Sequence, residues 1–171
     1  IYMLDDTIRY NIAFGKTEGI DDADIWEALK QAQLDEFVKS LDEGLDTMIG
    51  EAGVRLSGGQ RQAITLLMAS IQKPKLLLLD EHTAALDPKT AAKVLEISDQ
   101  IISENHLTAM MVTHNMKDAI AHGNRLIMMH EGKVILNIAG EDKKKLTVGD
   151  LLHQFEKVSG EEFASDKALL S

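Results

Sequence analysis

The first third of the chain carries apolar side chains at the spacing of amphipathic helices. Ile25, Leu29 and Ala32 recur on one face of a predicted helix, and Asp21 and Asp22 precede them. Acidic residues at this end favour a helix because they complement its macrodipole. The pattern therefore predicts a helix that starts near residue 21 and buries this face.

Further helices are predicted before residue 71. A short helix spans about 34–40, and Gly44 is expected to close it. Glycines interrupt residues 45–53, which are predicted to be a loop. A longer apolar-rich helix then begins at Ser57 and reaches about Ser70.

The pattern changes after Pro74. Residues 76–79 are four consecutive leucines, bounded by Pro74 and Asp80, and residues 109–113 form a second apolar run. Both runs predict buried parallel strands. A helix from Pro88, a favoured first helical residue, to about residue 104 separates them. This order of elements predicts an α/β fold with a parallel sheet.

The last third of the chain predicts smaller elements. A short helix is expected over 115–122. Residues 125–130 and 133–138 flank a Glu-Gly pair, which is a hairpin signal. Residues 147–158 begin with a capping-box pattern and predict a final helix.

Composition excludes several classes of protein. The net charge of −10 argues against a nucleic-acid partner, which needs a basic surface. The absence of cysteine excludes disulfides, thiolate metal sites and a cysteine nucleophile. Residues 1–54 hold 13 of the 28 acidic side chains and 4 of the 18 basic ones. We interpret this imbalance first as a solvated acidic face, and alternatively as a sign that the two parts differ in origin.

A candidate anion site lies at the predicted start of the helix at residue 57. Ser57, Gly58, Gly59 and Gln60 combine a hydroxyl, two glycines and free N–H groups at a positive helix end. A glycine-rich turn with a serine cap is the structural alternative. Residues 56–62, Leu-Ser-Gly-Gly-Gln-Arg-Gln, resemble the signature loop of ABC (ATP-binding cassette) ATPases, and the resemblance implies contact with ATP through residues 57–60.

Downstream segments resemble other motifs of the same family. The leucine run followed by Asp80 and Glu81 resembles a Walker B motif, although a buried strand with a polar turn has the same pattern. The resemblance implies that Asp80 holds the Mg²⁺ shell and that Glu81 polarises the attacking water. Residues 85–87 resemble the D-loop, which implies that Asp87 crosses a dimer interface. Residues 112–114 resemble the strand that ends in the switch histidine, so His114 would contact the γ-phosphate.

One expected motif is missing from this sequence. A Walker A loop, G-x-x-x-x-G-K-[ST], wraps the phosphates of ATP. The Gly15-Lys16-Thr17 segment has Tyr10 where that pattern needs its first glycine, and it is interpreted as a surface turn. The chain thus resembles the second half of an ABC nucleotide-binding domain, and we expect that it does not hydrolyse ATP alone.

The resemblance implies a three-part organisation. Residues 1–72 would form the helical signature subdomain, residues 73–140 part of a RecA-like, P-loop NTPase core with a parallel sheet, and residues 141–171 a helical tail. The implied cofactors are ATP and Mg²⁺. The implied partners are a second nucleotide-binding domain, joined across the signature loop, and a transmembrane transporter subunit. Residues 47–53 resemble the loop that contacts this subunit at the cytoplasmic face of the membrane.

The two ends of the chain resemble different ABC groups. Residues 6–15 and 49–53 resemble exporters. The part after about residue 60 resembles an uncharacterised importer-type group, some members of which are thought to serve amino-acid uptake. One hypothesis is a chimera joined between about residues 50 and 62, and the alternative is a divergent natural protein.

The sequence supports three hypotheses about function. The first is the ATP-hydrolysing part of a transporter. The second is an engineered or recombined non-catalytic fragment, which the missing Walker A loop favours. The third, a soluble non-transport ABC ATPase, is disfavoured by the exporter-like segments. The transported substrate stays open, because a membrane domain would select it. The direction of transport also stays open, because the two parts of the chain resemble different classes of transporter.

Overall fold

A computed structural model of the chain describes residues 3–13, 20–50 and 54–159. The chain divides into two compact units, residues 1–111 and residues 112–171. The predicted surface turn at Gly15-Lys16-Thr17 and the glycine at position 53 lie outside the described residues. Within the described part of the chain, every helix is too short or too polar to cross a membrane.

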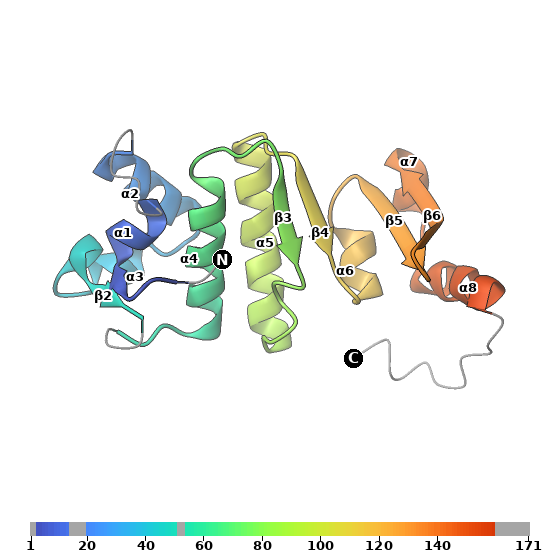
Figure 1. Ribbon diagram of the computed structural model, residues 1–171, viewed down its shortest axis with the longest axis horizontal. Coiled ribbons are helices and arrows are strands. Elements are labelled where there is room, and N and C mark those ends of the chain that lie inside the picture. Colours follow the sequence, from blue (N-terminus) through green and yellow to red (C-terminus); the bar gives the residue numbers. More distant parts are fainter. Residues whose placement is uncertain (1–2, 14–19, 51–53, 160–171) are drawn as a thin grey trace. The chain divides into compact units, whose positions relative to one another are not determined.

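Helices dominate the first unit (Figure 1). They confirm the helices predicted from the apolar spacing, and add a short one before residue 14. Their bounds are α1 Ile8–Ala13, α2 Asp22–Gln31, α3 Asp35–Lys39, α4 Gly58–Ser70 and α5 Pro88–Glu104, with a 3₁₀ turn at Gly44–Asp46.

The three longer helices start at side-chain caps. Asp21 and Asp24 form a capping box at α2, and Ser57 and Gln60 form another at α4. Asp87 caps α5, whose first residue is proline. Each cap satisfies N–H groups that lack a partner within the helix, so these starts are encoded locally.

One continuous apolar core holds the helices of the first unit together. Helix α4 packs on α1 and on α5, and Figure 1 shows it between these elements. Fully buried side chains come from several helices: Ile8, Ile12, Ile25, Leu29, Ile64, Leu67 and Ile101. The inward face predicted for residues 25–32 is confirmed, because these apolar side chains belong to this core.

Both strands predicted for the first unit are present at the predicted positions. The prediction that both are buried is wrong, because several of their apolar side chains are exposed. Strand β3 (Leu77–Asp80) pairs with β4 (Ala109–Val112), and their arrows point the same way in Figure 1. Leu77 and Leu79 are buried, whereas Leu78 is 64% exposed. The reason is the two-residue period of a strand, because the helical core covers only one face of this sheet. Met110 and Val112 of β4 are also exposed.

The segment predicted to be a loop over 45–53 has local structure in its described part. It contains the 3₁₀ turn and strand β2 (Met48–Ile49), and β2 pairs antiparallel with β1 (Asp6–Thr7). The expectation that Gly44 closes the preceding helix is also wrong, because α3 ends at Lys39. Pairing between segments far apart in sequence leaves no local signal, which explains the difference.

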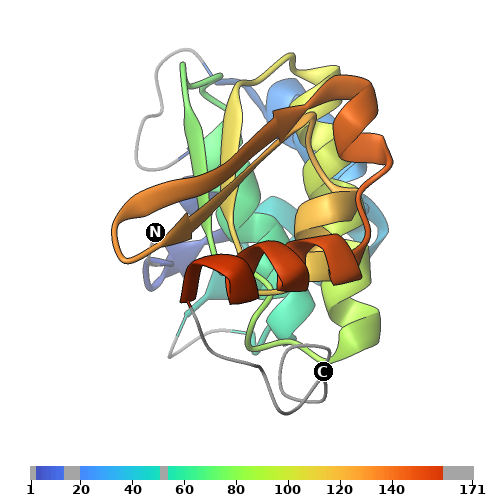
Figure 2. The same ribbon diagram turned by 90° about the vertical axis from the view of Figure 1, so that its right-hand side faces the viewer.

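The second unit contains a hairpin flanked by helices. Its elements are α6 Met116–Ala121, β5 Arg125–His130, β6 Lys133–Ala139, α7 Gly140–Lys144 and α8 Val148–Ser159. The hairpin is confirmed: Glu131 and Gly132 both have positive φ, as its tight turn requires. Figure 2 shows α8 beside the hairpin, and Gln154 donates a hydrogen bond to the carbonyl of Ile135 at 3.0 Å.

Candidate functional site

The N-terminal turn of α4 is closed by its own side chains. The N–H of Gln60 donates to Ser57 Oγ at 3.2 Å, and the N–H of Ser57 donates to Gln60 Oε1 at 2.9 Å. This capping box does not reach the N–H groups of Gly58 and Gly59. The first N–H groups of an α-helix have no carbonyl partner within the helix, and those of Gly58 and Gly59 are among them. They lie at the positive end of α4, which favours an anion.

Both glycines of this turn are approached closely by the same chain. A Cβ on Gly58 would lie 2.9 Å from Leu86 Cδ2, and a Cβ on Gly59 would lie 2.7 Å from Thr90 Cγ2. The structure therefore brings the predicted signature loop against the predicted D-loop and the first turn of α5. Sequence reasoning missed Thr90, because no motif of the sequence links residue 90 to residue 59.

The segment from Asp80 to Asp87 joins β3 to α5 through a folded turn. Asp80 ends the strand, and Glu81 has φ of +43°, a conformation uncommon outside glycine. The N–H of Ala84 donates to the carbonyl of Glu81 at 3.0 Å. This turn therefore continues directly from the residues predicted to act on water and on magnesium.

Asp87 caps α5 with one carboxylate oxygen. Its Oδ1 accepts from the N–H groups of Lys89 and Thr90, each at 3.1 Å. A hydrogen bond from the Thr90 side chain and the bonds from these backbone N–H groups hold the pKa of Asp87 below its ordinary value. The predicted dimer-bridging residue thus has a local role in its own helix.

His82 anchors the turn to α5. Its Nε2 lies 3.2 Å from Ser98 Oγ, and the Ser98 hydroxyl donates to the carbonyl of Val94 at 2.8 Å. Since the single hydroxyl proton is already donated, the His82 Nε2 carries the hydrogen of the first contact. The buried Ser98 therefore helps to hold the segment that follows β3.

The carboxylates at the end of β3 fit a magnesium site completed by phosphates. Asp80 and Glu81 are exposed, and Mg²⁺ prefers such oxygen ligands together with water and phosphate groups. Among residues 3–13, 20–50 and 54–159, no three His, Cys, Asp or Glu side chains form a metal-binding group. The two carboxylates have the oxygen donors that Mg²⁺ takes from protein side chains.

His114 lies in the second unit, whereas Asp80, Glu81 and Asp87 lie in the first. Its side chain is exposed. The next residue, Asn115, donates its N–H to Thr113 Oγ1 at 3.0 Å, and its side chain caps α6. The histidine is therefore followed immediately by a hydrogen-bonded turn.

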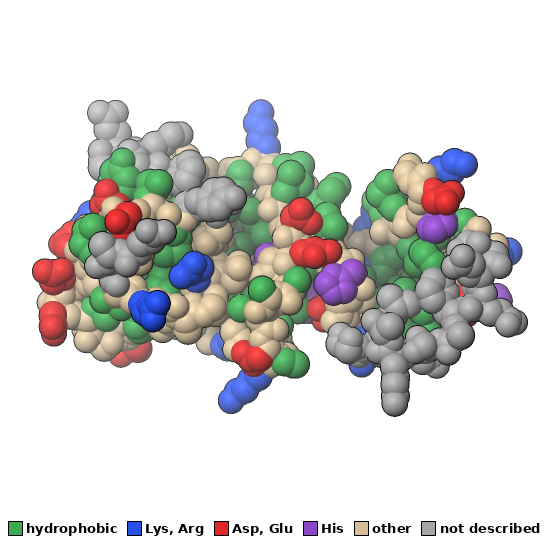
Figure 3. All heavy atoms as spheres, turned by 60° about the horizontal axis from the view of Figure 1, so that its bottom comes forward, with side chains coloured by type: hydrophobic (Ala, Val, Ile, Leu, Met, Phe, Trp, Pro, Cys, Tyr) green, Lys and Arg blue, Asp and Glu red, His purple; other side chains and the backbone are tan. Residues whose placement is uncertain are grey.

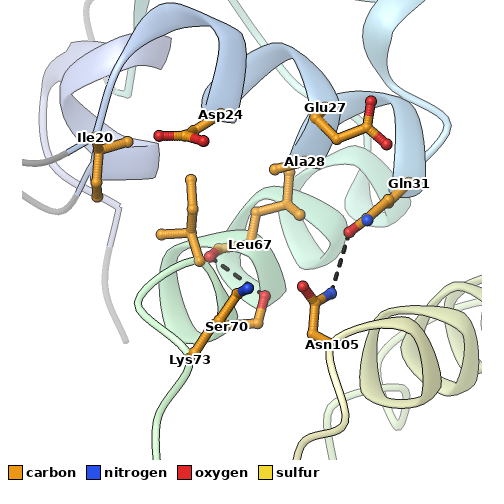
Figure 4. Close-up of a pocket in the computed structure, with 10 residues that line it drawn as sticks. Ile20, Asp24, Glu27, Ala28, Gln31, Leu67, Ser70, Lys73 and Asn105 are labelled. Atoms are coloured by element: carbon orange, nitrogen blue, oxygen red, sulfur yellow. Dashed lines mark hydrogen bonds between the residues drawn. The ribbon is translucent and has the colours of Figure 1, made fainter.

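A separate pocket of about 420 Å³ lies between α2, the end of α4 and the turn after α5 (Figure 4). Asp24 and Glu27 of α2 line it, together with Lys73. Asn105 donates to Gln31 Oε1 at 3.1 Å across its wall. None of the predicted site residues lines this pocket.

Acidic side chains gather over the part of the first unit that contains α1 to α3 (Figure 3). Asp21, Asp22, Asp24, Glu36 and Asp42 are exposed. The arrangement agrees with the interpretation of the charge imbalance as a solvated acidic face.

Comparisons with known proteins identify what the chain resembles. A family model described as ABC transporter matches residues 4–84. A tyrosine transport ATP-binding protein of Clostridioides difficile is 54% identical over 101 residues, which is 59% of this chain and 40% of that protein. An uncharacterized ABC transporter ATP-binding protein, YwjA, of Bacillus subtilis is 39% identical over 75% of this chain and 22% of its own length.

A solved structure agrees with these sequence matches. A bacterial Atm1-family ABC exporter with ATP bound aligns with a TM-score of 0.67 and 27% identity. The alignment covers 93% of this chain and 27% of that one. The chain therefore spans less than half of each of these relatives.

Proposed function

We propose that the chain is part of the ATP-binding domain of an ABC transporter and that it contributes to ATP-driven transport, because an ABC transporter family model and ATP-binding proteins of that family match it. It supplies the signature side of one ATP site. It also supplies residues that act on magnesium, water and the γ-phosphate of another. The α/β architecture and the likeness to the exporter support this assignment.

The observation that carries the proposal is the N-terminal turn of α4. The N–H groups of Gly58 and Gly59 lie beyond the reach of the capping box, at the positive end of a helix of 13 residues. In this role they bind the phosphates of a nucleotide held by a second ATP-binding domain. Ser57 and Gln60 contact the same nucleotide after their capping bonds exchange partners.

Asp80, Glu81 and His114 serve the hydrolytic side. A bound Mg²⁺ ion would supply charge stabilisation at the phosphates. Asp80 would hold the shell of that ion, Glu81 would orient and polarise the attacking water, and His114 would donate a hydrogen bond to the γ-phosphate. Asp87, at the turn between β3 and α5, faces the partner domain across the dimer.

The remaining partner in this proposal is a transmembrane transporter subunit. Residues 47–50, the described part of the predicted contact loop, are tied to the N-terminal segment by the β1–β2 pair. Contact through this loop places the domain at the inner face of a membrane. The transported substrate is then selected by the membrane subunit and not by this chain.

Calorimetry with Mg–ATP tests the hydrolytic side first. The purified chain is titrated beside a Glu81→Gln variant, and turnover is measured in both. Because the sequence contains no G-x-x-x-x-G-K-[ST] pattern, we expect no binding up to millimolar ATP. Tight binding with turnover lost in the variant would mean that another segment cradles the phosphates, and the proposed division of roles would be wrong.

Complementation in trans tests the signature side. The partner is a full-length ABC ATP-binding protein that is chosen for an intact Walker A loop and carries a substitution of its signature serine. Adding this chain is expected to restore ATP hydrolysis, and adding a Ser57→Arg variant is not. Failure of the parent chain to restore activity would favour the second candidate function, a non-catalytic fragment, which the missing phosphate loop supports.

A further inference from the structure

Two segments that lie far apart in sequence meet at the start of α4. Gly59 is the second residue of this helix, and Thr90 lies in the first turn of α5. A Cβ on Gly59 would approach Thr90 Cγ2 to 2.7 Å, a separation that real Cβ atoms essentially never show. Only a residue without a side chain allows this contact between the two helix starts.

The position of the Thr90 methyl group is itself determined by hydrogen bonding. The Thr90 side chain bonds the Asp87 carboxylate, and the Thr90 N–H donates to Asp87 Oδ1 at 3.1 Å. The hydroxyl therefore faces Asp87 and the methyl faces Gly59. A β-branched side chain held in this way cannot rotate freely to relieve a clash.

The contact at Gly58 is softer. Its nearest neighbour, Leu86 Cδ2, is the far end of a flexible side chain. Thr90 is therefore the more rigid of the two contacts between the turns.

From this geometry we propose that Thr90 is a positioning residue, which fixes the Ser57–Gln60 turn to the turn that ends at Asp87 so that both move as one body. We call this fixed contact between Thr90 and Gly59 the lock, and it depends only on contacts within this chain. Its consequence for ATP hydrolysis rests on the proposed function. In that role, the signature loop and the D-loop would keep a constant arrangement relative to each other when they reach an ATP site.

The sign of a glycine-to-alanine substitution tests the lock. Alanine normally stabilises a helix relative to glycine. Gly149 is also the second residue of its helix, and its nearest neighbour is 3.6 Å away, an ordinary contact. We expect Gly149→Ala to raise the melting temperature by about 1–2 °C and Gly59→Ala to lower it by about 2–4 °C.

Two substitutions of Thr90 separate its methyl from its hydroxyl. Thr90→Ser keeps the hydroxyl and removes the methyl, so it should return Gly59→Ala to within about 1 °C of the parent chain. Thr90→Val keeps a methyl towards Gly59 and should not restore stability. Stabilisation by Gly59→Ala in the parent chain, or equal rescue by serine and valine, would overturn the proposal.

The complementation assay gives a readout that fold stability does not control. Thr90→Ser alone is expected to leave the melting temperature nearly unchanged and to reduce the restored hydrolysis about two- to tenfold. Thr65→Ser is the matched control, because this threonine lies on α4 and its hydroxyl donates to the carbonyl of Arg61 in the same helix. Equal rates for both variants would refute the functional role. A parent chain that does not complement would contradict the proposed function, while the melting experiment would still decide the lock.

Discussion

The helices and the β3–β4 sheet of the first unit differ in how completely they bury their apolar side chains. The helices pack on one another around a continuous core, in which Leu67 is 1% exposed. The sheet packs one face on that core and leaves Leu78, on the other face, 64% exposed. A strand with leucines on both faces needs two layers to bury them, and the described helices supply one. A leucine buried among the helices therefore contributes more to the free energy of folding than a leucine on the exposed face of the sheet.

The largest expected effect comes from removing a leucine from the core. Leu67→Ala should lower the free energy of unfolding by about 3–5 kcal/mol, because it opens a cavity among packed side chains. Leu78→Ala is the matched control and should change it by less than about 0.5 kcal/mol. Urea denaturation measures both. Equal losses would show that the outer face of the sheet is covered in solution, and the comparison would fail.

A somewhat smaller effect is expected at a buried polar residue of the helical region. Asn11 is fully buried, and its Nδ2 donates to the carbonyls of Leu4, Asp6 and Thr7. Asn11→Asp replaces these donors by an acceptor, so it should cost about 2–4 kcal/mol of unfolding free energy. Asn137→Asp, at an exposed position of the hairpin, is the control. A loss at Asn11 no larger than that of the control would contradict the hydrogen-bond assignment.

The smallest expected effect is the acid sensitivity of an exposed ion pair in the same region. Arg9 Nε bonds Asp46 Oδ1 at 2.9 Å, and this bond lowers the pKa of Asp46. A lowered folded-state pKa contributes stability that is complete above the unfolded value, near pH 4, and is lost as the pH falls through the folded value.

The corresponding measurement is the melting temperature between about pH 6 and pH 2.5. The parent chain should lose stability in the acid range, and Asp46→Asn should lose slightly less. Solvent screening keeps the difference small. Parallel curves for the two chains would show that the Arg9 pair contributes nothing measurable.

Local patterns predicted the elements with strong caps or turns. The helix starts at Ser57, Asp87 and Thr147 were predictable because each residue bonds N–H groups within its next three positions. The hairpin was predictable because its Glu-Gly turn lies between two apolar runs. The β1–β2 pair was not predictable, because its strands have two residues each and lie far apart in the chain.

The residues of the candidate site also fall into two groups: those that local sequence patterns indicated, and those that only tertiary packing brings together. The sequence indicated the chemical types at positions 57–60, 80, 81, 87 and 114, and the roles of these residues remain proposals. It could not indicate that Thr90 meets Gly59, since that contact depends on how α4 packs against α5. The predicted domain boundaries and the suspected chimera also remain hypotheses.

The lysines near the end of the described chain show where the division lies. By itself, the sequence determined helix and strand positions, caps, turns and motif residues, because these depend on side chains close together along the chain. It presented residues 143–145 as one run of equal charges. The tertiary structure buries Lys143, whose Nζ donates to the carbonyls of Ile120 and His122 at the end of α6, and leaves Lys144 and Lys145 exposed. Burial, partner choice and close approach depend on packing between distant segments, and only the folded chain brings those segments together.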